Sequence, residues 1–284
     1  FRSYASVLPS TNLNQGTDNS IVIVNGLPFV VDSGSKRKSG VGFLLGGELL
    51  LRQSFSTDNA LVGSLGLAGR FYPSIETTYL TVNAQAGIEH KIPRGLITTS
   101  LIAEQDYSET DAFFRSFGGR IETSRLIGEA GRIYGSATFS YRDYLDNSYQ
   151  DGTRAELTGY YDRFVGAGRF FRFIGGATAE KTQTSYLSYN ELSAGLGFYS
   201  ELPMGFTAYV QGVYANRQYL ARAPFADETR RDHRVELMTT LTKRDLSFHG
   251  LAPQVTYSFT RNISNSTFDD YTSHSFDVRL VKEF

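Results

Sequence analysis

The sequence predicts an all-β fold, a fourteen-stranded antiparallel barrel that crosses an outer membrane with transmembrane strands. Three observations lead to this class. Apolar and polar residues alternate along most of the chain, whereas no segment shows a helical period. The alternating segments recur about every twenty residues, roughly one membrane-crossing strand and its connection. The chain also has 28 Gly, 18 Tyr and 21 Phe but only 7 Pro, a composition typical of many strands joined by tight turns.

The segment 79–90 shows the alternation clearly. Leu80 and Val82 fall on one face, and Thr81 and Glu89 fall on the other, as in a strand whose two faces meet different surroundings. The same pattern continues to the end of the chain. In chain order the predicted strands are residues 2–8, 40–55, 60–72, 77–92, 95–107, 112–127, 132–145, 153–165, 169–181, 187–201, 206–220, 233–244, 253–262 and 273–284.

The predicted connections alternate in length. Short turns rich in Gly, Pro and Asp include STDN at 56–59 and GAG at 166–168. Longer polar connections occupy 147–152, 222–232 and 264–270. Short turns at one end and long loops at the other are typical of outer-membrane barrels, with both termini on the short-turn side.

A soluble β-sandwich would show a similar alternation of apolar and polar residues. The two folds differ in what the polar face meets, which is water around a sandwich and a lumen inside a membrane barrel. A chain with many evenly spaced strands and few prolines to protect sheet edges closes more readily than it forms a sandwich. In lipid, closure is obligatory because every backbone polar group needs a partner. The polar face then lines a lumen, where we expect the charged residues Glu48, Arg70, Glu89, Arg120, Arg142, Glu156, Arg234 and Glu236.

Composition excludes several other classes. No run of apolar residues is long enough to form a transmembrane helix. The net charge of −1 argues against a nucleic-acid-binding surface. The absence of cysteine excludes disulfides and thiolate metal sites. We expect a single barrel domain over residues 1–284, in which Phe1 begins a mature or trimmed chain.

The C-terminal strand ends on an aromatic residue without a tail. Such an ending resembles the signal by which the barrel-assembly machinery recognises outer-membrane proteins of Gram-negative bacteria. Lys282 departs from this signal because an apolar residue is usual there. We expect the strand to pair with residues 2–8 and so close the barrel. The residues that fit the signal are Phe276, Val278, Leu280 and Phe284.

Residues 10–38 interrupt the strand pattern and form a long first loop. Asn25-Gly26 lies between two apolar arms, 21–24 and 27–31. This dipeptide predicts a hairpin because both central residues of a type I′ turn need positive φ. The arms are about half the length that a membrane-crossing strand requires, so they are not counted among the fourteen.

Three interpretations of this hairpin remain open. It is an external hairpin on the first loop, a plug folded into the lumen, or a pair of additional short wall strands. In the plug interpretation, asparagine amides hydrogen-bond lumen charges. The gating or plug candidates are Asn12, Asn14, Asn25 and Gly26.

Two short motifs carry a resemblance to a known family. VLPSTNLNQGTD at 7–18 resembles the Ser/Asn-x-Asn signature that opens the barrel of the Slam family, the surface lipoprotein assembly modifiers. The last hairpin resembles that of the same barrel, with Arg261, Ser264 and Asn265 in an R-x-x-S-N arrangement. The fourteen strands also fit, so the resemblance covers the whole chain in layout.

The resemblance implies export of specific lipoproteins or small secreted proteins across the outer membrane, without chemistry. The motif residues would then be structural or gating positions, and no catalytic residue, cofactor or metal site carries over. Family members usually have a periplasmic helical-repeat domain before the barrel. Nothing helical precedes Phe1, so we expect an excised barrel or a barrel-only relative. The implied partners are outer-membrane lipid, lipopolysaccharide, the barrel-assembly machinery and the cargo, with the barrel itself a monomer.

Two other functions remain open. A passive or substrate-selective solute channel, similar to a porin, would suit a mixed-charge lumen. An adhesin or receptor would use the long outer loops. Catalysis has little support, because His233 beside Asp232 is a common chance pairing and the sequence has no Walker loop, GxGxxG or HExxH motif.

Overall fold

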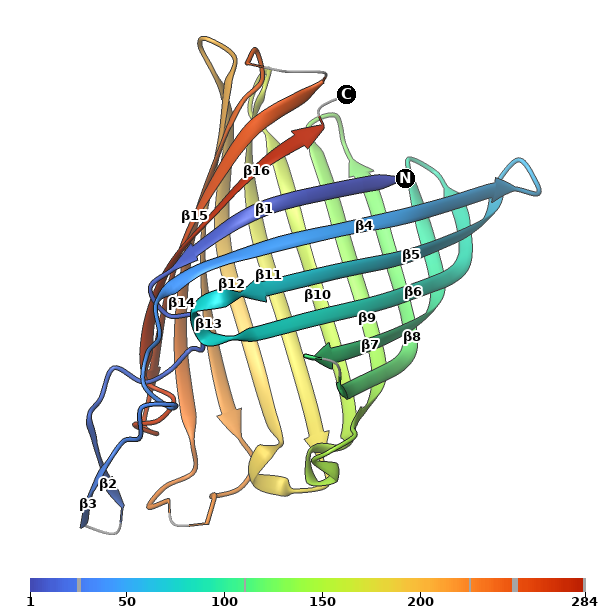
Figure 1. The fold of residues 1–284 in the computed structure, drawn as a ribbon. Helices are drawn as coiled ribbons and strands as arrows, with labels where there is room; N and C mark the ends of the chain where they lie inside the picture. The colour runs from blue at the N-terminus through green and yellow to red at the C-terminus, as the bar shows by residue number, and fades with distance from the viewer. Residues whose placement is uncertain (25–26, 110, 225, 247–249, 283–284) are drawn as a thin grey trace.

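The computed structural model describes residues 1–24, 27–109, 111–224, 226–246 and 250–282. Fourteen antiparallel strands form a closed barrel in which each strand pairs with its neighbours in sequence and β1 closes the ring between β16 and β4 (Figure 1). The wall strands are β1 (Arg2–Ser10), β4 (Gly40–Ser54), β5 (Asn59–Tyr72), β6 (Thr77–Ile92), β7 (Gly95–Ser108), β8 (Asp111–Ile127), β9 (Gly131–Tyr144), β10 (Gly152–Phe164), β11 (Arg169–Thr182), β12 (Tyr189–Leu202), β13 (Phe206–Tyr219), β14 (Arg231–Lys243), β15 (Leu251–Ser264) and β16 (Tyr271–Lys282).

The structure confirms the predicted fold class and strand order. The observed strand ends differ from the predicted ones by at most two residues, as at Tyr189, where the prediction began at 187. From β4 through β16, the described ladders show one register shift. It lies between β7 and β8, at Asp106 and Tyr107. The register is nearly regular because a slip of one residue would turn a strand's whole apolar row toward the lumen. The alternation of apolar and polar residues therefore predicts the strands of this wall well.

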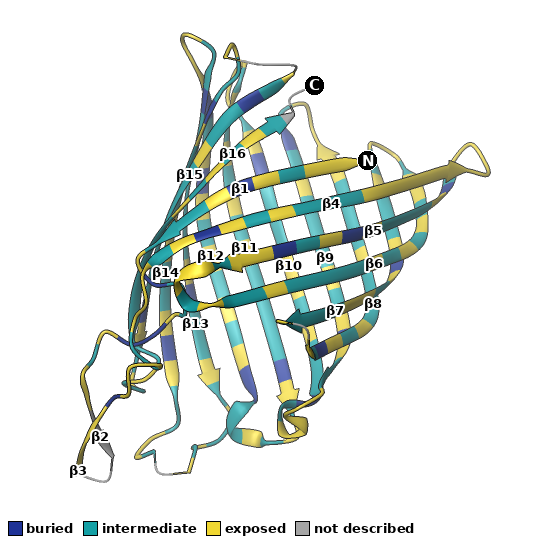
Figure 2. Cartoon of the chain, viewed as in Figure 1, coloured by how far each residue is buried: buried dark blue, intermediate teal, exposed yellow. Residues whose placement is uncertain are grey.

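One face of the wall carries large apolar side chains exposed to the surroundings. Leu101 is 74% and Leu192 is 68% exposed, and Figure 2 shows exposed and less exposed residues alternating along the strands. Such a continuous apolar surface would be unstable in water. It suits contact with lipid acyl chains, as on the outside of a transmembrane barrel.

The other face is concave and polar. Some of its ion pairs join strands that are not neighbours, which requires side chains that converge. Arg142 of β9 lies 2.8 Å from Glu180 of β11, and Arg234 of β14 lies 3.3 Å from Glu191 of β12. The polar rows therefore face the lumen.

Both termini lie at the same end of the barrel (Figure 1). The opposite end carries the first loop and the connections that follow β9, β13 and β15. Three short 3-10 helices occupy connections at this end: η1 (Pro73–Ile75), η2 (Ser148–Gln150) and η3 (Ser185–Leu187). Within the described ranges, no helix has the length and apolarity needed to cross a bilayer.

The hairpin of the first loop forms a separate two-stranded sheet, β2 (Ile21–Val24) and β3 (Leu27–Val30), which has no place in the wall. Figure 1 shows it projecting beyond the end of the barrel opposite the termini. In this structure the hairpin therefore extends away from the barrel, and a plug or gating role for the first loop stays a prediction. Asn25 and Gly26, its predicted turn, lie outside the described residues.

Candidate functional site

The contact between β1 and β16 differs from the other contacts of the wall. The β1–β4 ladder is continuous from Arg2–Glu48 to Ser10–Gly40, and the β15–β16 ladder is continuous from Leu251–Lys282 to Asn262–Tyr271. Between β1 and β16 the registered pairs are Ser6–Arg279, Val7–Val278 and Ser10–Ser275. We call this contact the seam. It is where the ring of strands is held least continuously.

The seam is unpaired toward the termini. No ladder pair joins Ser3, Tyr4 or Ala5 to β16 within the described strands, and Figure 1 shows β1 and β16 diverging toward the end that carries both termini. Ser6 lies where the ladder stops. It is 6% exposed, and its hydroxyl has no hydrogen-bond partner in the described part of the chain. Pro9 has no N–H to donate and lies in the gap between two of the registered pairs.

The other end of the seam is closed by polar contacts that we call the clasp, residues 11–18 of the first loop with residues 267–274. The N–H of Thr11 donates to the oxygen of His274 at 2.9 Å, and the N–H of His274 donates to Oγ1 of Thr11 at 2.9 Å. Thr17, almost fully buried, donates its hydroxyl to the oxygen of Thr267 at 2.6 Å. Asn12 donates to the oxygen of Thr272 at 3.1 Å.

The two asparagines of the first motif organise this loop. The Asn12 side chain is 3% exposed and also exchanges two hydrogen bonds with the backbone of Gly16, both 2.9 Å long. Asn14 donates to the oxygen of Lys36 at 2.8 Å and accepts from the N–H of Lys38 at 2.9 Å. Each side-chain amide donates to backbone carbonyl oxygen and accepts from one backbone N–H of the loop. Asparagine suits both positions because its side chain carries both a donor and an acceptor.

The return segment of the loop has its own turn. Ser35 donates its hydroxyl and its N–H to the Asp32 carboxylate, at 2.7 and 3.1 Å, and Gly34 donates its N–H at 2.6 Å. These donors, first the Ser35 hydroxyl, hold the pKa of Asp32 below its usual value.

The second motif shapes the connection that receives the first loop. Arg261 forms a two-point pair with Asp270, with distances of 2.6 and 3.1 Å. Ser264 donates its hydroxyl to Asp232 at 2.7 Å, and Asn265 accepts from the N–H of Arg231 at 2.8 Å. The first motif therefore bonds to residues on either side of the connection that the second motif shapes, about 250 residues away in the sequence.

Arg230 and Asp232 complete this arrangement, in a structural role that the sequence did not indicate. Arg230 lies 2.7 Å from Asp232 and 2.7 Å from Asp269, and so connects β14 to the last loop. Asp232 is buried. An Arg-x-Asp spacing at a strand start is too common to have indicated this role.

The predicted lumen charges all face the concave side but separate into several groups. Arg52 and Glu89 pair at 2.7 Å, and Arg70 lies in register with Leu44 and Tyr79. Arg234 contacts Glu236 at 2.8 Å as well as Glu191. Glu48, Arg120, Arg142 and Glu156 line one polar cavity of about 440 Å³.

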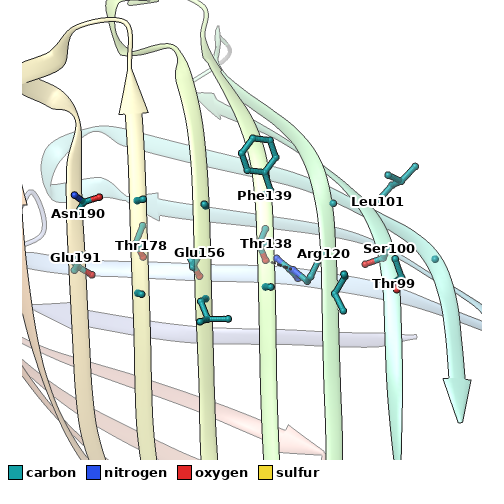
Figure 3. Close-up of a pocket in the computed structure, with 18 of the residues that line it drawn as sticks. Thr99, Ser100, Leu101, Arg120, Thr138, Phe139, Glu156, Thr178, Asn190 and Glu191 are labelled. Atoms are coloured by element: carbon teal, nitrogen blue, oxygen red, sulfur yellow. Dashed lines mark hydrogen bonds between the residues drawn. The ribbon is translucent and has the colours of Figure 1, made fainter. Parts of the chain in front are cut away.

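A larger hollow of about 1140 Å³ extends over β6–β12. Figure 3 shows its residues, with Arg120 lying toward Thr138, to which its Nε donates at 3.2 Å. Most of its lining is apolar. Ala137 and Ala155, for example, belong to lipid-facing rows.

Asp162 is the most enclosed charge of the wall. It is fully buried between Arg132 and Arg172, each 2.7 Å away. The guanidinium of Arg172 also lies over the Tyr160 ring, 3.9 Å from its centre. Because both cations depend on one carboxylate, this cluster couples β9, β10 and β11.

Asp232 and His233 do not form a proteolytic pair in this structure. Asp232 faces the lumen, whereas its neighbour His233 faces outward because successive strand residues point to opposite sides. The hydroxyl of Tyr214 lies 2.6 Å from Nδ1 of His233, and that of Tyr257 lies 2.8 Å from Nδ1 of His274. No group of His, Cys, Asp or Glu able to hold a metal ion is found among the described residues.

The described residues of the C-terminal signal lie on the lipid side of β16. Val278 pairs with Val7 and Val255, and the tilted ring of Phe276 packs against Tyr257 with ring centres 5.2 Å apart. Leu280 is exposed. Phe284 lies outside the described residues.

An apolar exterior, a polar interior and a closed ring of fourteen strands define the class of bacterial outer-membrane β-barrels. The family described as Surface lipoprotein assembly modifier matches residues 1–284, and the chain belongs to it. The family resemblance inferred from the two motifs is confirmed. A protein of Pasteurella multocida (strain Pm70) named Surface lipoprotein assembly modifier is 25% identical over 126 residues, which cover 40% of this chain and 24% of that relative.

Solved structures are similar in fold alone. OmpT, an outer membrane protein of Vibrio cholerae, has a TM-score of 0.52 and 7% identity, with 98% of this chain and 95% of that chain covered. The Pseudomonas putida toluene transporter TodX has a TM-score of 0.50 and 10% identity, with 99% and 89% covered. A deltaS2 mutant of the TodX monoaromatic hydrocarbon channel has a TM-score of 0.53 and 9% identity, with the same coverage.

Proposed function

We propose that this barrel moves specific lipoproteins or small secreted proteins across the outer membrane to the cell surface, and that the wall opens at the seam to let them pass. The single observation that carries the proposal is the asymmetry of the seam. It is clasped at the end that bears the long loops and unpaired toward the termini. The family to which the chain belongs is named for surface lipoprotein assembly, in agreement with such a cargo.

In this proposal the side chains do no covalent chemistry. β1 stays attached to β4 through its continuous ladder, and the ion pairs of β9–β11, whose carboxylates are buried, keep the opposite wall rigid. Opening then breaks few backbone hydrogen bonds, because few residues of β1 and β16 are paired with each other. The clasp is the element that sets how far the seam separates.

A surface-proteolysis comparison tests the export function. Cells with and without the barrel are treated with an external protease, and the lipoproteins cleaved are identified by mass spectrometry. We expect at least one lipoprotein to be cleaved only when the barrel is present, and re-expression to restore its cleavage. An unchanged set of surface lipoproteins and secreted proteins would contradict export.

A second candidate function is a solute channel, favoured by the polar cavity that contains Glu48, Arg120, Arg142 and Glu156. Planar-bilayer conductance of the purified barrel separates the two functions. Steady ohmic current that sugars or organic acids compete for supports a channel. A closed barrel that still exports protein supports the first proposal.

We further expect β16 to be the segment that the barrel-assembly machinery recognises, because its apolar row faces lipid and closes the ring last. The barrel is expected to act as a monomer.

A further inference from the structure

The unpaired part of the seam leaves one edge of β1 free. Ser3, Tyr4 and Ala5 pair with Gly47, Gly46 and Leu45 of β4, which satisfies one side of this short segment. On the other side, β16 supplies no ladder partner within the described residues. Free backbone groups are costly in a membrane. A free strand edge is also the place where an extended peptide adds to a sheet.

We propose that the edge Ser3–Ala5 accepts an extended segment of the exported polypeptide as an added strand. This inference rests on the proposed export function and names how the cargo would first engage the barrel. An added strand would supply the backbone partners that β16 does not. It would also keep the ring closed while the chain passes.

The surroundings of the edge define the chemistry of the added segment. Ala5 and Val7 face lipid, whereas Tyr4 and Ser6 face the lumen in register with the row that includes Glu48. Across the gap, β16 turns Leu280 outward and exposed. A fitting segment therefore alternates apolar residues toward the lipid with polar residues toward the lumen.

The lumen side of the gap offers polar partners. The buried hydroxyl of Ser6 has no partner in the described part of the chain. Arg279 of β16 is paired with Asp277, so its charge is already balanced. Uncharged polar residues such as Thr or Ser are thus the best match on this face, because a charged one would compete with an existing ion pair.

Photo-crosslinking tests the added strand directly. A photoreactive amino acid replaces Ala5 in the purified barrel in detergent, and the probe is a synthetic peptide of alternating valine and threonine. A matched variant carries the photoreactive residue at Ala155, which faces lipid from β10 and is paired with both Phe139 and Ala179. A second peptide has the same side chains but methylated amide nitrogens, so it cannot donate backbone hydrogen bonds.

We expect crosslinking at position 5 with the unmodified peptide and its loss with the methylated peptide, with none at position 155. In the same samples, the amides of residues 3–5 should exchange with deuterium more slowly when the unmodified peptide is present. Equal crosslinking of the two peptides, or of the two positions, would overturn the added strand, as would crosslinks between two barrels. If any of these results is found while the surface-proteolysis comparison still shows export, the added strand is refuted and the export function stands.

Discussion

The side-chain amide of Asn12 donates to the main-chain oxygen of Thr272 at 3.1 Å and thereby ties the first loop to the last strand. The two residues lie at opposite ends of the sequence. Their contact closes the loop-bearing end of the seam. The Asn-x-Asn motif therefore helps to hold β1 and β16 together at this end.

Replacing Asn12 with Ala should loosen the clasp. The buried amide donates to two carbonyl oxygens and accepts from Gly16, so its loss leaves buried backbone groups without partners. We expect the free energy of unfolding in urea to fall by about 1–3 kcal/mol. The matched control is Asn147→Ala, in an exposed connection where its side chain caps nothing. Equal effects of both substitutions would contradict the role of Asn12.

Replacing Arg261 with Lys should not preserve the second motif. Arg261 binds both oxygens of Asp270, and an ammonium group cannot reproduce this two-point geometry. We expect faster external proteolysis of the connection 265–270 in Arg261→Lys and in Asp270→Ala. The double variant should be little worse than either single one, because both remove the same contact. Fully additive effects would show that the two residues act separately.

A side chain at Gly46 should detach Tyr4 from β4. The Tyr4 ring occupies the space that a β-carbon at Gly46 would fill, so Gly46→Ala forces the ring to move. We expect a loss of about 0.5–1.5 kcal/mol in unfolding free energy, the cost of moving the ring away from its preferred rotamer. Gly175→Ala, where nothing lies near the added carbon, should be nearly neutral. Combining Gly46→Ala with Tyr4→Ala should recover part of the loss, and no recovery would count against this explanation.

Removing the charge of Asp162 should weaken the wall opposite the seam. Asp162→Asn leaves Arg132 and Arg172 without their shared carboxylate in a fully buried position. Because the Arg132 and Arg172 side chains are themselves 38% and 22% exposed, we expect a loss of about 1–3 kcal/mol. The control is Asp143→Asn, which breaks a pair with the largely exposed Arg115 and should cost about 0–1 kcal/mol. Similar losses in the two variants, measured by urea unfolding, would be inconsistent with a rigid buried cluster.

The wall could be predicted from the sequence because lipid and lumen impose opposite demands on successive residues. Leu80 and Thr81, for example, cannot exchange faces without exposing a polar row to acyl chains. The same physics placed Glu48, Arg120 and Arg234 on the concave side of the barrel. It also identified the segments 21–24 and 27–31 as a hairpin too short to join the wall.

The seam could not be predicted in this way. Residues 2–8 and 273–284 alternate like every other wall strand, and nothing in that pattern indicates that their ladder stops beyond Ser6–Arg279. The contacts of Thr17 with Thr267 and of Asn12 with Thr272 join segments whose approach depends on the closed ring. Local sequence could supply motifs at these positions but not their partners.

The most direct test of seam opening is export by a barrel whose seam is locked. The chain has no cysteine, so Val7→Cys with Val278→Cys forms one reducible crosslink between β1 and β16 at a registered pair. The control, Val255→Cys with Val278→Cys, locks the continuous β15–β16 ladder through the same residue. We expect oxidation to abolish surface display of the barrel-dependent lipoprotein in the first variant, and reductant to restore it, while the control exports normally. Undiminished export by the oxidised Val7–Val278 variant would contradict the account.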